Sequence, residues 1–254
     1  MGVGKGKTQK KTTPRKENPP NKNNPKTGAL AVIKMRDGPL DAVRGIAFAL
    51  MCLNHCGIAT TPTAATVAAG HIARTAFLVL VGVTYALFPK GAPRRVWTIA
   101  AHALLVSVVS RMLLPTAWVR FGVLHCIASC LAALVVIDRA GMLPFGAEGV
   151  WALCSIAIHN LAPRTNTALD YVTRSGYKTI DAFPLVTWFP VVLFGLAVAR
   201  AAKLARFSKL ARSAKARRKG DTGRFSITKW VGRNTLPLYT AQMLVLIYVL
   251  SRKP

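Results

Sequence analysis

Apolar residues dominate seven stretches of the chain, and short polar or charged segments separate these stretches. The stretches cover about 40–58, 71–88, 96–114, 120–137, 147–162, 182–200 and 231–250. Most have about 18–20 residues, and an α-helix of that length crosses the roughly 30 Å hydrocarbon core of a bilayer. The pattern predicts an all-α fold, a polytopic membrane bundle of about seven transmembrane helices. The fifth stretch is the shortest, so a six-span bundle with a re-entrant fifth segment is the main alternative.

Charge is concentrated between the apolar stretches. The formal net charge is +27, which in a soluble domain would first suggest nucleic-acid binding. Here 52% of the residues are hydrophobic, and they lie in long runs. If the N-terminus is cytoplasmic, the cytoplasmic segments hold about 25 Lys and Arg and the opposite segments hold eight. The positive-inside rule therefore predicts a cytoplasmic N-terminus and, with seven spans, a C-terminus on the other side.

The chain has two strongly basic segments, one at its N-terminus and one before the last predicted span. Residues 1–36 contain ten Lys and Arg with many Asn, Pro and Thr and show no signal-peptide pattern, which predicts a disordered, basic cytoplasmic arm. A solvated, topology-setting role for this arm is favoured over contact with lipid or nucleic acid. Residues 37–254 form the predicted transmembrane domain. Within it, residues 200–230 form a basic cytoplasmic loop, for which an amphipathic surface helix and a soluble linker are both considered.

The cysteines do not indicate a disulfide framework or a metal site. All five fall inside apolar runs, where free Cys packs as a small hydrophobic residue. His55–Cys56 and His125–Cys126 are adjacent pairs, and adjacent helical residues point to different faces. Metal binding is therefore not expected.

Polar residues at membrane depth are the candidates for function. Asp41 and Arg44 are spaced i,i+3 and can pair on one helix face at the cytoplasmic end of the first span. Arg233 and Asn234 open the last span at the same face. The opposite end gathers a second set, namely Asn54, His55, His71, Arg74, Arg120, His125 and Asp181.

The second set has the components of a general-base site. A neutral imidazole can take a proton from an amine or hydroxyl, or attack a thioester itself, and a carboxylate can orient it. Asp181 is the acidic residue placed to serve both His55 and His125. The alternative is that these histidines bridge helices through hydrogen bonds. His102, in the middle of the third span, has no evident partner in the sequence and is interpreted as packing.

The cytoplasmic set also has two interpretations. Arg44 and Arg233 could bind the phosphates of a nucleotide-like donor, because guanidinium groups match phosphate oxygens. They could equally reach lipid headgroups while pairing with Asp41.

Four segments together resemble the heparan-α-glucosaminide N-acetyltransferase-like integral-membrane family. DAVRGIAFALMCLNH is similar to the first-helix signature of that family, and FLVLVGVTYAL is similar to its second helix. RFGVLHCIA resembles its Phe-Gly-x-Leu-His motif. IDAFPLVTWFPVVLFGLAVA and GRNTLPLYTAQ resemble its last two helices. The resemblance runs from about residue 37 to 250 and omits the basic arm.

This resemblance implies a membrane acyltransferase that moves an acetyl group from cytosolic acetyl-CoA to an acceptor on the far side. It implies catalytic roles for His55, His125 and Asp181. Acceptor contacts are expected at Asn54, His71, Arg120 and Gln242, and donor contacts at Arg44, Arg233 and Asn234. Small members of the family often read His-Gln-Pro where this chain reads Ala241-Gln242-Met243, and an amide such as Gln242 cannot act as a base.

Our sequence-based hypothesis is therefore a membrane-bound, acetyl-CoA-dependent acyltransferase without a metal. The expected acceptor is a glycan or another envelope-side amine or hydroxyl. The expected location is the bacterial cytoplasmic (inner) membrane, with membrane lipids as partners, a homo-oligomer as an open option and nucleic acid not favoured. The alternative is a non-enzymatic multi-span protein, either a transporter or a membrane scaffold.

Overall fold

The computed structural model of the protein describes residues 38–161, 183–210 and 227–252. The predictions for the basic arm, for Asp181 and for residues 211–226 of the basic loop concern parts of the chain outside these ranges. Residues 200–210, which were predicted to begin that loop, continue the helix that precedes it.

The described residues are α-helical and contain no strand. The elements in chain order are α2 (Gly38–Ala59), α3 (Ala64–Leu87), the 3-10 helix η1 (Pro89–Gly91), α4 (Ala92–Leu113), α5 (Val123–Arg139), α6 (Ala147–Leu161), α8 (Leu185–Leu210), α9 (Ile227–Arg233) and α10 (Thr235–Ser251). The prediction of an all-α membrane bundle is confirmed.

A long helix lies at each of the seven predicted positions, but the helices differ in span length. Within the described ranges, α2, α3, α4 with η1, and the first part of α8 are long and apolar enough to cross a membrane. The bent pair of α9 and α10 would be a fifth span. At 17 and 15 residues, α5 and α6 are shorter than the roughly 20 residues of a full crossing. The protein is thus an integral membrane protein, and the part of the chain that the structure describes contains four or five helices of spanning character.

Two predicted boundaries differ from the structure. The second helix begins at Ala64, about two turns before the predicted start at residue 71. Thr63 and Thr66 form a capping box there, and the Ala-rich segment that follows favours helix. The last stretch is not one straight helix, because α9 and α10 meet at an angle of 82°. Pro237 lies in the first turn of α10, where its missing N–H is tolerated.

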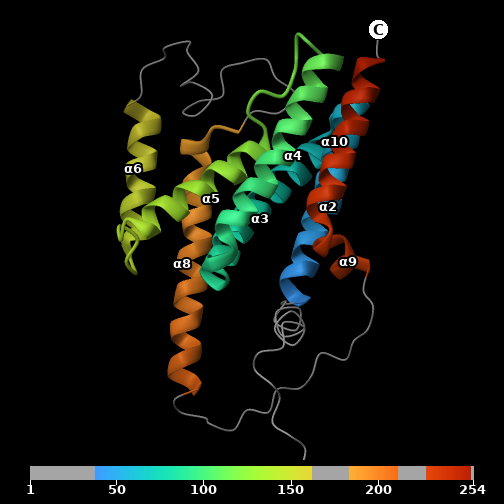
Figure 1. Cartoon of the computed structure of the whole chain (residues 1–254). Helices are drawn as coiled ribbons and strands as arrows, with labels where there is room; N and C mark the ends of the chain where they lie inside the picture. Colours follow the sequence, from blue (N-terminus) through green and yellow to red (C-terminus); the bar gives the residue numbers. More distant parts are fainter. Residues whose placement is uncertain (1–37, 162–182, 211–226, 253–254) are drawn as a thin grey trace, which may run out of the picture. The chain divides into compact units, whose positions relative to one another are not determined.

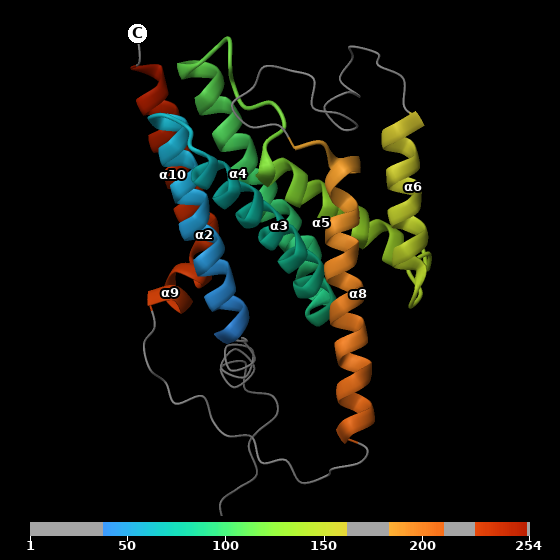
Figure 2. The same cartoon turned by 180° about the vertical axis from the view of Figure 1, so that it is seen from behind.

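Glycines allow the central helices to approach closely. A Cβ on Gly82 of α3 would lie 2.0 Å from the carbonyl oxygen of Val192 on α8. A Cβ on Gly195 of α8 would lie 2.2 Å from the carbonyl oxygen of Val79 on α3. Contacts through small residues are typical of helix pairs in membranes. Figures 1 and 2 show α3 crossing α8 on one side, while α2 runs beside α10 on the other.

Alternating helix directions define two ends of the described bundle. We use "Asp41 end" for the end where α2 begins and "His55 end" for the end where α2 finishes. The start of α4 and the end of α3 lie at the Asp41 end, as does α9 (Figure 1). The start of α3 and the end of α4 lie at the His55 end.

Candidate functional site

A buried carboxylate organises the Asp41 end. The Asp41 side chain is almost completely buried and accepts a hydrogen bond from Arg44 Nη1 at 2.9 Å, as the i,i+3 spacing predicts. Its other oxygen lies 3.3 Å from Nε of Arg233, which comes from α9. Arg44 also donates from Nη2 to the hydroxyl of Thr84 on α3, at 2.6 Å. One carboxylate therefore ties α2 to α9, and Arg44 extends the network to α3.

Backbone contacts hold α9 against the start of α2. A Cβ on Gly232 would lie 1.7 Å from the Asp41 carbonyl oxygen, and a Cβ on Gly45 would lie 2.2 Å from the Thr228 carbonyl oxygen. Asn234 donates from its side-chain amide to the carbonyl of Trp230 at 2.9 Å. The Asn234 amide therefore stabilises the corner between α9 and α10.

At the opposite end, His55 of α2 is buried close to polar residues of α3 and α10. Only 8% of the residue is exposed. The Tyr239 ring lies 6.1 Å from the imidazole, centroid to centroid, and the Gln242 side chain is near enough to interact with the imidazole although the pair does not meet hydrogen-bond geometry. Within the described residues, His55 Nδ1 and Gln242 Oε1 are both buried without a hydrogen-bond partner. Unpaired buried polar atoms are uncommon in folded proteins, and each costs about 1–3 kcal/mol.

Asn54 of α2 and Arg74 of α3 meet at Gly70, where the two helices are in contact. A Cβ on Gly70 would lie 2.2 Å from Oδ1 of Asn54 and 3.0 Å from Nη2 of Arg74, so both side chains converge on this glycine. Asn54 is buried, and Arg74 places a positive charge near the His55 ring. A larger residue at position 70 would displace both groups.

His125 occupies a separate position between α4 and α5. Its Nε2 lies 3.3 Å from the Ser107 hydroxyl, and that hydroxyl donates to the carbonyl of Val119 at 2.8 Å. Because the Ser107 proton is committed to Val119, His125 Nε2 is the donor in this pair. The Phe121 ring stacks at a tilt beside the imidazole, with 5.7 Å between centroids. His125 thereby helps to fix the loop that precedes α5.

Arg74 and two aromatic rings connect the two histidines. The Arg74 guanidinium lies over the Phe183 ring at 5.3 Å, and the Phe183 N–H donates to the Phe121 carbonyl at 2.9 Å. Phe121 in turn contacts His125. The predicted catalytic aspartate, Asp181, precedes Phe183 by two residues and lies outside the described residues.

The remaining predicted residues lie near the surface. His71 is exposed on α3, and Arg120 is exposed on the loop before α5, where it lies over the Trp118 ring at 5.4 Å. His102 differs from its sequence-based interpretation because its Nδ1 lies 2.9 Å from the Thr240 hydroxyl on α10. That hydroxyl donates to Leu236, so His102 is the donor and links α4 to α10.

Sequence reasoning missed several groups that fasten the Asp41 end. Glu148 accepts from Arg200 at 2.7 Å, and Asp138 accepts from the Tyr85 hydroxyl at 2.7 Å. Lys203 donates to the carbonyl of Ala86. The available signal was the scarcity of acidic residues: the described ranges contain three, and each of them accepts a hydrogen bond at this end. Among the described residues, no three His, Cys, Asp or Glu side chains gather as a metal site.

The fold and the site together define a membrane helix bundle with a buried histidine at one end and a buried carboxylate at the other. The family model for the heparan-α-glucosaminide N-acetyltransferase catalytic domain matches residues 36–244. The chain belongs to this family of membrane acetyltransferases. Neither the curated proteins nor the solved structures compared with the chain gave a match.

Proposed function

We propose that the protein transfers an acetyl group from acetyl-CoA to an amine or hydroxyl acceptor, such as a sugar, at the His55 end of the bundle. The observation that carries this proposal is the pair of unpartnered buried atoms, His55 Nδ1 and Gln242 Oε1, in a chain of this family. A primary amine placed between them could donate one hydrogen bond to each atom, and a hydroxyl group could donate to one of them.

The two atoms suit complementary tasks. With its proton on Nε2, the His55 imidazole has a lone pair at Nδ1 and can act as a general base. When the acceptor group is an amine, Gln242 Oε1 can accept a hydrogen bond from its second hydrogen and orient it. Acetyl-CoA supplies the activated thioester. As the acceptor nitrogen or oxygen bonds to the acetyl carbon, His55 takes its proton, and the carbon–sulfur bond breaks to release the coenzyme A thiolate. The proton then passes from His55 to that thiolate.

The other predicted residues are assigned supporting roles. Asn54 and Arg74 lie together at Gly70, and the positive charge of Arg74 near His55 would stabilise an anionic tetrahedral intermediate. We assign His125 and Asp181 to orienting the loops around the acceptor. His71 and Arg120, which are exposed at the same end, would contact the parts of the acceptor away from His55.

We assign donor recognition to the Asp41 end. Arg233 is half-exposed and Arg44 is partly exposed, so their guanidinium groups can meet phosphates while Asp41 fixes their positions. Asn234 holds Arg233 in place by closing the corner of α9. Asp41 and His55 are fourteen residues apart, about 21 Å along the helix, so a long donor would be needed to serve both ends. We also propose that the N-terminus is cytoplasmic and that the membrane is the bacterial inner membrane, in which case the donor would be cytosolic and the acceptor would lie on the outer side.

The test is acetyl transfer by His55→Ala in proteoliposomes, with labelled acetyl-CoA and a panel of amino sugars. General-base catalysis contributes about 10²–10⁴-fold, so a rate loss of that size is expected. His159→Ala, which replaces a partly exposed histidine hydrogen-bonded to Thr187, is the control and should retain the wild-type rate. The proposal fails if His55→Ala keeps its activity, or if the wild-type protein acetylates no acceptor.

A further inference from the structure

We propose that the outward side of α4 binds one anionic phospholipid in the leaflet at the Asp41 end. The headgroup phosphate lies between Lys90 and Arg94, and an acyl chain follows the apolar side chains further along the helix. Neither cation has a role in the acetyl transfer proposed above, so this is a second site with a ligand of its own.

The exposed residues of α4 lie on one side of the helix. With η1, α4 forms a continuous helix over Pro89–Leu113. At 100° per residue, six exposed residues fall within about 40° of the direction of Lys90. This surface, which we call the α4 stripe, consists of Lys90, Arg94, Trp97, Leu104, Val108 and Met112. The buried residues Ala103, Val106 and Ser110 lie on the opposite side, where α4 packs against the bundle.

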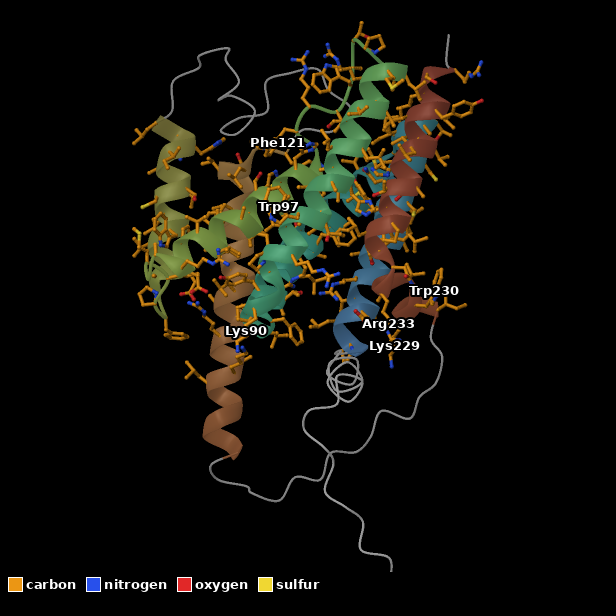
Figure 3. The ribbon with its side chains drawn as sticks, in the orientation of Figure 1. Lys90, Trp97, Phe121, Lys229, Trp230 and Arg233 are labelled. Carbon is orange, nitrogen blue, oxygen red and sulfur yellow. The ribbon has the colours of Figure 1, made fainter. Side chains whose placement is uncertain are left out.

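The order of residues along the stripe matches the order of groups in a phospholipid. The two cations come first, and Trp97 follows at about 10 Å from Lys90 along the helix axis. Trp is typical of the boundary between headgroups and acyl chains. Leu104 and Val108 come next and are exposed by 62% and 48%, as expected for side chains that meet an acyl chain. In Figure 3, Lys90 lies toward the Asp41 end and Trp97 lies further along the bundle.

The two cations of the stripe have no ion pair among the described residues. Lys90 and Arg94 are both exposed and are spaced i,i+4, so their charged groups can meet the oxygens of one phosphate. Arg95 lies off the stripe and donates instead to the carbonyls of Phe88 and Gly91. The three acidic side chains in the described ranges accept hydrogen bonds from other residues. The negative charge that complements the stripe therefore comes from a lipid headgroup.

Charge also favours an anionic lipid over two other occupants of the stripe. A second copy of the chain, paired through the same stripe about a two-fold axis along the membrane normal, would place Lys90 and Arg94 opposite their own counterparts. Like charges at such a contact repel each other. The ammonium group of a zwitterionic lipid cancels the charge of its phosphate, whereas an anionic lipid keeps a net negative charge for the two cations.

Fluorescence quenching by brominated lipids tests the proposal on the full-length protein, with Trp97 as the reporter because it lies on the stripe and is 78% exposed. The other four tryptophans are replaced by Phe. The protein is reconstituted in phosphatidylcholine vesicles with increasing fractions of brominated phosphatidylglycerol or, in parallel, brominated phosphatidylcholine. The variants are Lys90→Gln and Arg94→Gln, singly and together. The matched control is Arg111→Gln, which removes an exposed cation near the other end of the same helix.

The expected result is that both brominated lipids quench Trp97 and that phosphatidylglycerol does so at the lower fraction. Each single variant should weaken this preference about fivefold, the effect of one cation at an anionic membrane surface, and the double variant should abolish it. Arg111→Gln should keep the preference of the parent protein. Thermal unfolding confirms that each variant is folded.

Four results would overturn the proposal. If neither brominated lipid quenches Trp97, protein such as a second copy covers the stripe. Equal quenching by the two lipids would show a lipid-facing helix without anionic selectivity. A preference that survives in the double variant would assign the selectivity to other cations. Loss of the preference on addition of free coenzyme A would assign Lys90 and Arg94 to the donor. None of these outcomes depends on whether the protein transfers an acetyl group.

Discussion

The two ends of α2 carry polar groups of opposite status. At the Asp41 end, one buried carboxylate is matched by two arginines, and Arg44 also contacts Thr84. At the His55 end, the buried imidazole and the Gln242 amide each keep an atom without a partner in the described structure. Both sets are buried in the same bundle. They differ in whether their buried polar atoms have hydrogen-bond partners, and not in how deeply they are buried.

The presence of hydrogen-bond partners distinguishes buried polar groups that stabilise the fold from buried polar groups that can bind a ligand. A buried charge is tolerated when it is paired and hydrogen-bonded, and removing one partner is strongly destabilising. A buried polar group without a hydrogen-bond partner lowers the stability of the free protein. Such a group is therefore expected where it binds a ligand or takes part in a reaction. We therefore expect substitutions at the Asp41 end to affect folding first and substitutions at the His55 end to affect activity first.

The largest effect on stability is expected from Asp41→Asn. The amide keeps the size of the side chain but leaves two guanidinium groups without a counter-charge, which costs about 3–5 kcal/mol. Thermal unfolding in detergent and the yield of monodisperse protein measure this loss. Asp138→Asn is the matched control, because its partner is the neutral Tyr85 hydroxyl and an amide oxygen still accepts that bond. Equal loss in the two variants would show that the arginine pairing contributes nothing special.

A smaller effect is expected from Gly232→Ala. The new methyl group would overlap the Asp41 carbonyl oxygen, so α9 must move away from α2 at a cost of about 1–3 kcal/mol. Gly149→Ala in α6 is the control, because its methyl group meets nothing within 4 Å and Ala favours helix. Unfolding temperatures should fall for the first variant and hold or rise for the second. The same direction in both would contradict close packing of α9.

The smallest change in stability is expected from Gln242→Leu. This variant removes a buried amide oxygen that has no hydrogen-bond partner among the described residues, so the free energy of unfolding should stay within about 1 kcal/mol of wild type or increase. Acetyl transfer should nevertheless fall by at least about tenfold, because an acceptor group loses one of its two hydrogen bonds. A strongly destabilised variant would mean that Gln242 is part of a saturated network. The contrast between the two ends would then fail.

Much of the fold was predictable because helix length and apolar content are local properties. Helices lie at all seven predicted positions, and the Asp41–Arg44 pair follows from i,i+3 spacing on one helix. The bend at Asn234 was not predicted, because a Pro in the first turn of α10 and a Gly at the end of α9 are compatible with several angles. The contact of Gly232 with the Asp41 backbone is what selects this one.

The candidate site was likewise predicted only in part from the sequence. The sequence indicated His55 and His125 as candidates because they are polar residues at membrane depth. It did not indicate their partners, which lie on other helices. Thr240 beside His102, Ser107 beside His125 and Gln242 beside His55 are each more than ten residues away in the chain. No local pattern links residues that far apart.

The sequence by itself determined the class of protein: long apolar helices, charge concentrated in the segments between them, and motifs of a membrane acetyltransferase family. These features follow from the free-energy cost of placing charge or unpaired backbone groups in hydrocarbon. That cost applies to each residue by itself and does not depend on tertiary contacts. Only the tertiary structure decided which polar groups are satisfied. A polar atom gains a hydrogen-bond partner only when packing brings atoms from different helices within hydrogen-bond distance. Packing places Asp41 between two arginines, whereas His55 Nδ1 has no partner among the described residues.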